Sequence, residues 1–125
     1  MLSILPVMAG GALGAALRYL VGRALPPVGV SGFPVATLCV NLIGGFAMGM
    51  LAAWLTRGGG GEGWRLFLGV GLLGGFTTFS AFSLDAMVMI DRGAWGLFAS
   101  YALLSVLGSV AALAFGMMIV RGSAA

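Results

Sequence analysis

The sequence has very few of the side chains that most enzymes use for acid–base and metal chemistry. Its 125 residues include no histidine, one cysteine and three acidic residues, and only 7% of the chain is charged. Without histidine or grouped acids, no nucleophile can be paired with a base, and most hydrolytic or transition-metal chemistry is excluded. Cys39 cannot form an internal disulfide, and its apolar surroundings indicate a small buried residue. We therefore do not expect an enzyme.

Apolar residues dominate what is present. They make up 61% of the chain, and the mean hydropathy is +1.15. Soluble domains carry about 25% charged residues, and a chain of this length could not bury so much apolar surface in water. All six basic residues are arginines that stand singly, without the basic patch of a nucleic-acid-binding protein. The composition predicts an integral membrane protein surrounded by lipid, with arginines at helix ends and no nucleic-acid partner.

Four apolar runs are long enough to cross a bilayer as helices, which takes about 20 residues each. We predict an all-α fold with spans at about residues 4–21, 33–55, 64–90 and 94–120. The connections carry turn and helix-breaking residues: Pro26-Pro27, the glycine run 58–61, and Asp91 to Gly93. No connection is long enough to separate domains, so residues 1–125 are expected to form a single transmembrane domain.

The arginines give no clear orientation in the membrane. Four spans place three on each side: Arg18, Arg23 and Arg92 on one, and Arg57, Arg65 and Arg121 on the other. Because an arginine excess on one side normally fixes topology, this balance predicts insertion in both orientations and antiparallel pairing of two copies. The alternative is one fixed orientation that this count does not resolve.

Glycine is abundant, with 23 residues, and recurs at four-residue spacing. The pairs Gly10 and Gly14, Gly45 and Gly49, and Gly71 and Gly75 follow the pattern that lets membrane helices approach closely. Tight packing leaves no wide lumen inside one subunit. A small solute is therefore expected to pass between helices or between subunits.

The third span contains a segment that is poor helix material. Paired glycines at 74 and 75 are followed by paired threonines at 77 and 78, within a run of about 27 residues. We predict a break in this helix near Gly74 to Thr78, because irregular backbone at membrane depth offers carbonyls to a cation and a helix start to an anion. The alternative is a continuous helix whose hydroxyls bond to the preceding turn.

Polar and aromatic side chains near this segment are candidates for an ion path, because polar groups inside a membrane are costly. Asn41 lies mid-span, where an interhelical hydrogen bond is the simpler interpretation. Phe79 and Phe82 share a face if the helix resumes after Thr78, and their positive ring edges can face an anion, although phenylalanine usually only packs. Together with the hydroxyl groups of the fourth span, these side chains suit the path of a small anion better than that of a cation or proton.

Hydroxyl groups form a stripe along the fourth span. Tyr101, Ser105 and Ser109 recur every four residues and therefore share one helix face. They can serve as donors to an anion or only as small packing residues. Asp85 is the sole acid within a span and lies toward its end, so the deep carboxylates typical of cation and proton paths are missing.

The sequence resembles the Fluc family of fluoride channels, also called CrcB, over nearly its whole length. The resemblance begins at residues 10–19 and 37–44, which read GGALGAALRY and TLCVNLIG. Its most specific part is the segment at residues 74–83, which reads GGFTTFSAFS. It implies a fluoride-selective channel that exports fluoride passively from a bacterial cell and protects against fluoride toxicity.

The resemblance also implies an assembly and a set of site residues. The assembly is an antiparallel, dual-topology homodimer with two narrow pores in the cell membrane. The fluoride pathway is formed by Asn41, Phe79, Phe82, Tyr101, Ser105 and Ser109. Arg18 matches an arginine near the pore entrance. The backbone carbonyls of Gly74 and Thr77 match positions that hold a structural sodium ion at the dimer interface, and no organic cofactor is expected.

Two positions depart from the family pattern. Ala81 stands where threonine is frequent, and Asp85 stands where glutamate is frequent. Neither change touches a group assigned to fluoride. Two other functions stay open: a small four-helix multidrug exporter, which would need a deep carboxylate that the first two spans lack, and a non-transporting membrane assembly subunit, which would explain the glycines alone.

Overall fold

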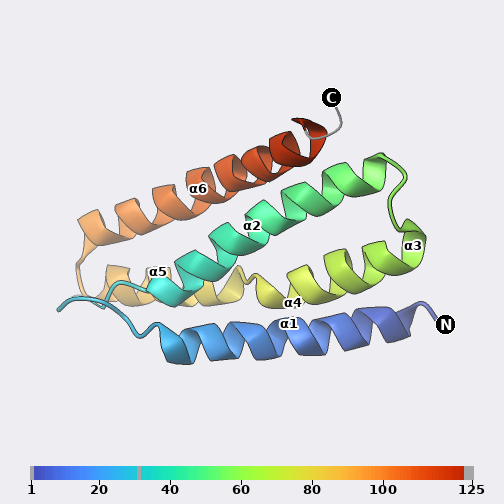
Figure 1. The fold of residues 1–125 in the computed structure, drawn as a ribbon. Coiled ribbons are helices and arrows are strands. Elements are labelled where there is room, and N and C mark those ends of the chain that lie inside the picture. Colours follow the sequence, from blue (N-terminus) through green and yellow to red (C-terminus); the bar gives the residue numbers. More distant parts are fainter. Residues whose placement is uncertain (1, 31, 123–125) are drawn as a thin grey trace.

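The protein folds as four long helical segments that run side by side (Figure 1). A computed structural model describes residues 2–30 and 32–122. Four helical segments are long and apolar enough to cross a membrane: Ile4–Ala24, Val35–Thr56, Gly61–Asp91 and Trp95–Gly122. The predicted four-span, all-α architecture is confirmed.

The first two helices begin and end where proline and glycine allow. Helix α1 (Ile4–Ala24) runs three residues beyond its predicted end, since the next proline after Pro6 comes only at Pro26. Helix α2 (Val35–Thr56) starts directly after Pro34, a residue that suits a helix start because its missing N–H would be unpaired there. Glycines with positive φ at 58, 60 and 61 turn the chain toward the third segment.

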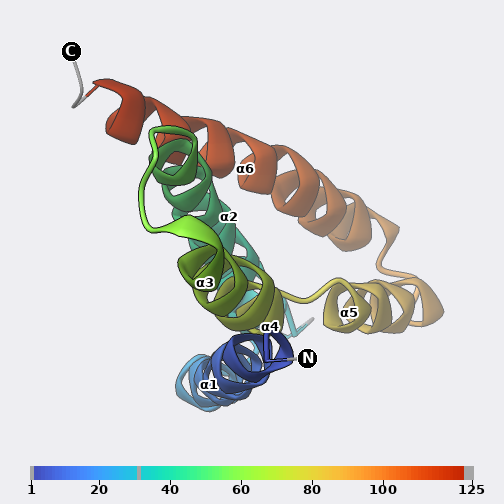
Figure 2. The ribbon, with the colours of Figure 1, turned by 90° about the vertical axis from the view of Figure 1, so that its right-hand side faces the viewer.

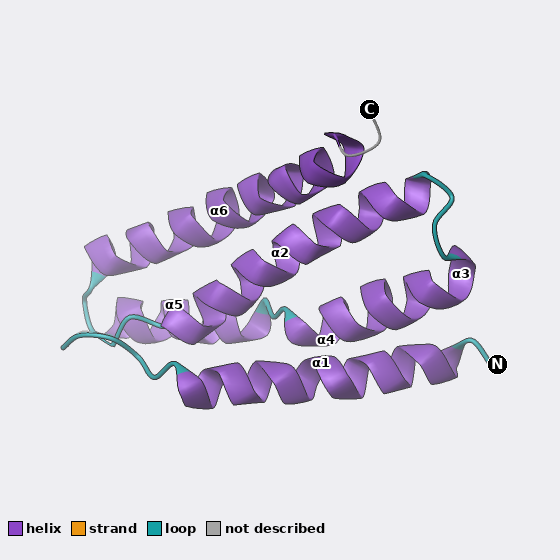
Figure 3. Cartoon of the chain, in the orientation of Figure 1, coloured by secondary structure: helices purple, strands orange, loops and turns teal. Residues whose placement is uncertain are grey.

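The third segment is built from four helical pieces and one interruption. Their bounds are α3 (Gly61–Trp64), the π-helix η1 (Arg65–Leu73), α4 (Gly74–Phe76) and α5 (Ser80–Asp91). The predicted break is present, but it lies at residues 77–79, because Gly74 and Gly75 still continue the helix (Figure 3). The π-helix was not predicted, because nine residues is far longer than the single turns in which this geometry usually occurs.

The last helix, α6 (Trp95–Gly122), lies alongside α2. In Figure 1 both termini lie at the end of the molecule where α2 connects to α3, and the α1–α2 and α5–α6 connections lie at the opposite end. An even number of crossings places both ends of the chain on one side. Alternate spans therefore run in the same direction, and α1 and the first half of the third segment are parallel neighbours, with Gly10 near Phe67 and Gly14 near Phe76.

The helices pack as two close pairs. α1 lies against η1 and α4, and α2 lies against α6, while α5 diverges from α1 after the break (Figure 2). Glycines form both contacts: a Cβ on Gly71 would lie 2.8 Å from the Val7 carbonyl oxygen, and one on Gly45 would lie 3.0 Å from the Ser109 carbonyl oxygen. The predicted glycine pairs therefore bring backbone against backbone.

Candidate functional site

The centre of the site is the break in the third segment. At Thr77 the backbone leaves the helix, with φ −81° and ψ 157°. The side-chain amide of Asn41, on α2, makes two hydrogen bonds to the backbone of Thr78. Nδ2 donates to the Thr78 carbonyl oxygen at 3.0 Å, and the Thr78 N–H donates to Oδ1 at 2.9 Å. The interruption therefore has paired backbone groups although it lies at membrane depth.

Side chains also complete the two helix ends that face the break. The Thr77 hydroxyl donates to the Leu73 carbonyl at 2.9 Å, and the Ala81 N–H donates to the Thr78 hydroxyl at 3.1 Å, which caps the first turn of α5. Arg18 of α1 donates from Nε to the Gly75 carbonyl at 3.1 Å. A cation at this position suits the negative end of the first half-helix.

Two backbone carbonyl oxygens at the break are available to a ligand. The Thr78 N–H, which would bond to Gly74 in a continuous helix, is taken by Asn41 instead. Among the described residues, no hydrogen bond reaches the carbonyl oxygens of Gly74 or Thr77. These are the two carbonyls that the family resemblance implies as sodium ligands, and neither accepts a hydrogen bond from the part of the chain that the structure describes.

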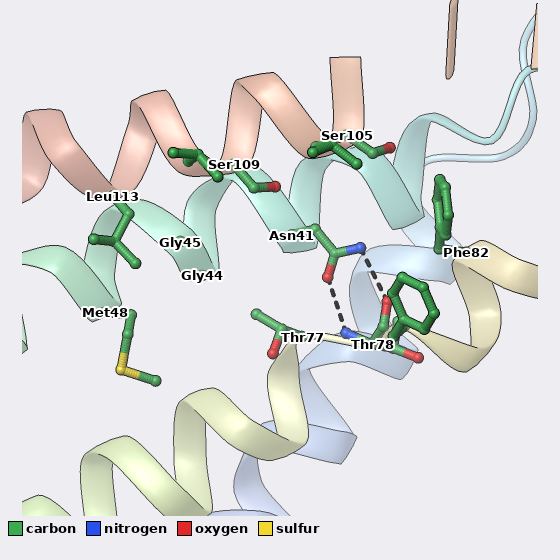
Figure 4. Close-up of a pocket in the computed structure, with 13 residues that line it drawn as sticks. Asn41, Gly44, Gly45, Met48, Thr77, Thr78, Phe82, Ser105, Ser109 and Leu113 are labelled. Atoms are coloured by element: carbon green, nitrogen blue, oxygen red, sulfur yellow. Dashed lines mark hydrogen bonds between the residues drawn. The ribbon is translucent and has the colours of Figure 1, made fainter. Parts of the chain in front are cut away.

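A groove of about 400 Å³ opens between α2, the break and α6. It brings together six of the predicted site residues: Asn41, Thr77, Phe79, Phe82, Ser105 and Ser109. Figure 4 shows Asn41 between the two serines of α6 and the threonines of the break. The remaining lining is apolar or glycine, and none of the described residues that line the groove is charged.

Phe79, the last residue of the break, and Phe82 of α5 lie together at the groove. Their ring centroids are 5.5 Å apart, and the rings are tilted by 36°. Phe79 is 76% exposed, whereas Phe82 is half-buried and its ring centroid lies 5.0 Å from that of Tyr101. One flank of the groove is therefore aromatic and open on the surface of a single subunit.

Tyr101 lies behind the groove rather than along it. It is fully buried, and its hydroxyl donates to the Asp85 carboxylate at 3.0 Å, joining α6 to α5. Its ring also meets Phe33 edge to face, with centroids 5.6 Å apart. The sequence stripe is thus divided: Ser105 and Ser109 face the groove, whereas the Tyr101 hydroxyl is used by Asp85.

Ser105 is the one buried polar side chain whose Oγ has no hydrogen-bond partner among the described residues. A serine inside a helix commonly bonds to the carbonyl four residues earlier, as Ser100 does with Gly96 at 3.0 Å. A buried hydroxyl left unpaired costs about 1–3 kcal/mol. The free Ser105 hydroxyl at the groove therefore points to a ligand that is not a part of this chain.

Arg18 lines a second cavity, of about 420 Å³, on the other side of the break. This cavity lies between α1 and α2 and also contains Arg23 and Thr37. Thr78 lines both the cavity and the groove. Thr78 and Arg23 were not predicted as site residues, although the pairing of two threonines before Phe79 was a usable signal for Thr78.

Gly44 is a further residue that the sequence analysis did not single out for the site. A Cβ at this position would overlap the Thr77 methyl group. Glycine is therefore required where α2 crosses the break. Its position three residues after Asn41 places it on the same side of α2, which was the available signal.

Comparisons with known proteins agree with this architecture. The family described as "CrcB-like protein, Camphor Resistance (CrcB)" matches residues 5–117. A protein of Phenylobacterium zucineum named "Fluoride-specific ion channel FluC" is 53% identical over 97% of each chain. Proteins with the same name from Caulobacter sp. (strain K31) and Novosphingobium aromaticivorans are 52% identical (97% of this chain, 96% of the relative) and 49% identical (94% and 95%).

These relatives are bacterial and carry the name of an ion channel, which agrees with the expectation that this chain is not an enzyme. With four apolar helices, the chain is a multi-pass protein of a bacterial cell membrane. The family match covers more than half of the sequence and includes the break, both phenylalanines and both serines. The chain belongs to the CrcB family.

Proposed function

We propose that this protein is a fluoride-selective channel that lets fluoride leave the cell passively and so protects it from fluoride toxicity. The observation that carries the proposal is the composition of the groove. The groove presents hydroxyl and amide donors and phenyl rings to a small solute. None of the described residues that line it is charged. The relatives that match almost the full length bear the name of a fluoride-specific channel.

The chemistry of fluoride fits these groups. Fluoride is small and strongly hydrated, so a pore has to replace its water with donors. The Ser105 hydroxyl has no hydrogen-bond partner within residues 2–30 and 32–122, and Asn41 uses only one of its two amide hydrogens on Thr78. Ring edges of Phe79 and Phe82 add weak positive potential. Neutral donors bind an anion without holding it as tightly as a fixed positive charge, and conduction needs such moderate binding.

A second, antiparallel copy is the proposed partner. Phe79 is 76% exposed, and the groove is open along one side of the subunit. A second copy would cover the groove and complete the pore wall. The three-against-three division of the arginines supports opposite orientations of the two copies.

A structural sodium ion between the copies fits the residues present. The carbonyl oxygens of Gly74 and Thr77, which accept no hydrogen bond from the described residues, are the kind of ligand that alkali cations prefer. When bound, the ion supplies positive charge near the anion path. The chain's own contribution is the Asn41 clamp, which takes the Thr78 N–H away from the Gly74 carbonyl.

The direct test is fluoride efflux from liposomes that contain the purified protein. We expect rapid efflux of fluoride, followed with a fluoride electrode, and no measurable efflux from chloride-loaded vesicles. A sodium-free arm tests the cation, and cross-linking of a single-cysteine pair tests the dimer. Absence of fluoride efflux from a monodisperse, reconstituted protein would rule the proposal out.

Ser105→Ala separates ligand binding from folding. Because the hydroxyl is buried and unpaired, its removal is expected to raise the free energy of unfolding by about 1 kcal/mol or more. Fluoride efflux should nevertheless fall about tenfold, as expected when one donor worth roughly 1.4 kcal/mol is lost. The measurements are thermal stability in detergent and efflux rate on the same preparation.

Ser100→Ala is the matched control on the same helix. Its hydroxyl already bonds to Gly96, and it lies outside the groove. Both its stability and its efflux should stay near the wild-type values. A Ser105→Ala variant that loses stability would show that the hydroxyl has a partner within the protein, and its assignment to fluoride would then fail.

A further inference from the structure

The second cavity leads from the end of α1 to the break. Arg23 lies in the last turn of α1 and is exposed, whereas Arg18 lies more than one turn deeper and is half-buried. Thr78, in the break itself, also lines the cavity. Because Thr78 also lines the groove, the cavity and the groove meet at one residue.

The positive charge of this cavity is not neutralised. None of its described lining residues is acidic. The ion pair between Arg65 and Glu62 lies at the opposite end of the bundle. Arg18 uses Nε on the Gly75 carbonyl, and no acceptor among the described residues is found for its other two nitrogens.

The two arginines have different positions and therefore different roles. Arg18 is anchored to the broken helix, so its removal would disturb the break as well as the charge. Arg23 has no hydrogen bond or ion pair with a described residue, and it is exposed where it lines the cavity. A cleft lined by one sign of charge between low-dielectric walls concentrates ions of the opposite sign.

We propose that Arg23 is the outer steering residue of the fluoride entrance, a role that rests on the proposed channel function. It raises the local concentration of fluoride at the cavity, from which the ion moves toward Arg18 and Thr78. Arg23 does not bind fluoride in the narrow path. Its removal therefore lowers capture of the ion and leaves the maximal rate unchanged.

A purely structural role would give a different result. In a purely structural role, an arginine in the last turn of a helix interacts with the helix dipole and with the lipid headgroups. Its loss would then change stability or the amount of active protein, and would scale efflux equally at every fluoride concentration. The dependence on fluoride and on ionic strength separates the two roles.

The test measures initial fluoride efflux against fluoride concentration for wild type, Arg23→Gln, Arg23→Lys and Arg121→Gln. Ionic strength is set with the salt of a bulky, impermeant anion. At about 10 mM ionic strength, where screening extends to about 30 Å, we expect Arg23→Gln to raise the half-saturating concentration roughly two- to fourfold. At about 1 M the difference should vanish, because screening shortens to about 3 Å.

The remaining variants define the controls. Arg23→Lys keeps the charge and should match wild type, and Arg121→Gln removes an exposed arginine from the other end of the bundle and should also match it. The steering role of Arg23 would be overturned if the effect of Arg23→Gln persists at high salt, is not restored in Arg23→Lys, or is reproduced by Arg121→Gln. The channel function would still stand in each of these cases. Absence of efflux from wild type would overturn the channel function and this role together.

Discussion

Asn41→Asp is expected to lower fluoride efflux by about 100-fold. The aspartate can still accept the Thr78 N–H, but it has lost the amide that donates to the Thr78 carbonyl and the second hydrogen that remains for the ion. It also places a negative charge on the anion path, at a depth where a charge costs about 2.5–3.5 kcal/mol. That cost corresponds to roughly a hundredfold in rate. Reconstituted efflux is the measurement.

Two further variants sharpen this experiment. Asn41→Ala should also lose most efflux, because the Thr78 peptide groups lose both partners, and it should in addition lower thermal stability. Cys39→Ala is the matched control, two residues away on α2 and outside the groove lining, and should conduct like wild type. An Asn41→Asp variant that conducts within threefold of wild type would remove Asn41 from the path.

Gly14→Ala is expected to destabilise the fold by about 1–3 kcal/mol, the usual cost of overpacking. A Cβ at this position would lie 2.8 Å from the Phe76 backbone nitrogen and would overlap the Leu72 carbonyl oxygen. These are backbone atoms, which cannot move aside as a flexible side chain can. The strain would fall on α4, directly before the break. Thermal loss of monodisperse protein in detergent measures the effect.

Gly22→Ala is a control on the same helix. A Cβ on Gly22 would meet nothing within 4 Å, so the alanine has room. Its stability should be unchanged or higher, by up to about 1 kcal/mol, because alanine favours the helix. Equal destabilisation by both alanines would mean that glycine acts in α1 through backbone flexibility and not through close approach to α4.

Much of the fold follows from local sequence. Span length, the prolines at 26 and 34 and the glycines after Arg57 fix where the first helices lie. The break was also predicted, from Gly74-Gly75 and Thr77-Thr78, but its place shifted to residues 77–79. Helix propensity marks a weak segment, whereas the exact residue at which it opens depends on Asn41, a partner 37 positions away in sequence.

The site was predicted less completely. Periodicity grouped Tyr101 with Ser105 and Ser109, but it gives the face of a helix and not what that face meets, so the pairing of Tyr101 with Asp85 was missed. It gave no reason to expect the π geometry of η1. Arg23 was counted only for topology, since its place in a cavity depends on how α1 crosses α2.

The bond between Tyr101 and Asp85 has a consequence for how the chain is made. The chain emerges from its N-terminus, so Asp85 reaches the membrane before α6 and its tyrosine exist. Until then, the acid has no hydroxyl donor inside the bilayer. The third and fourth helices are therefore expected to leave the insertion machinery as a pair, with Tyr101 closing over Asp85 as α6 arrives.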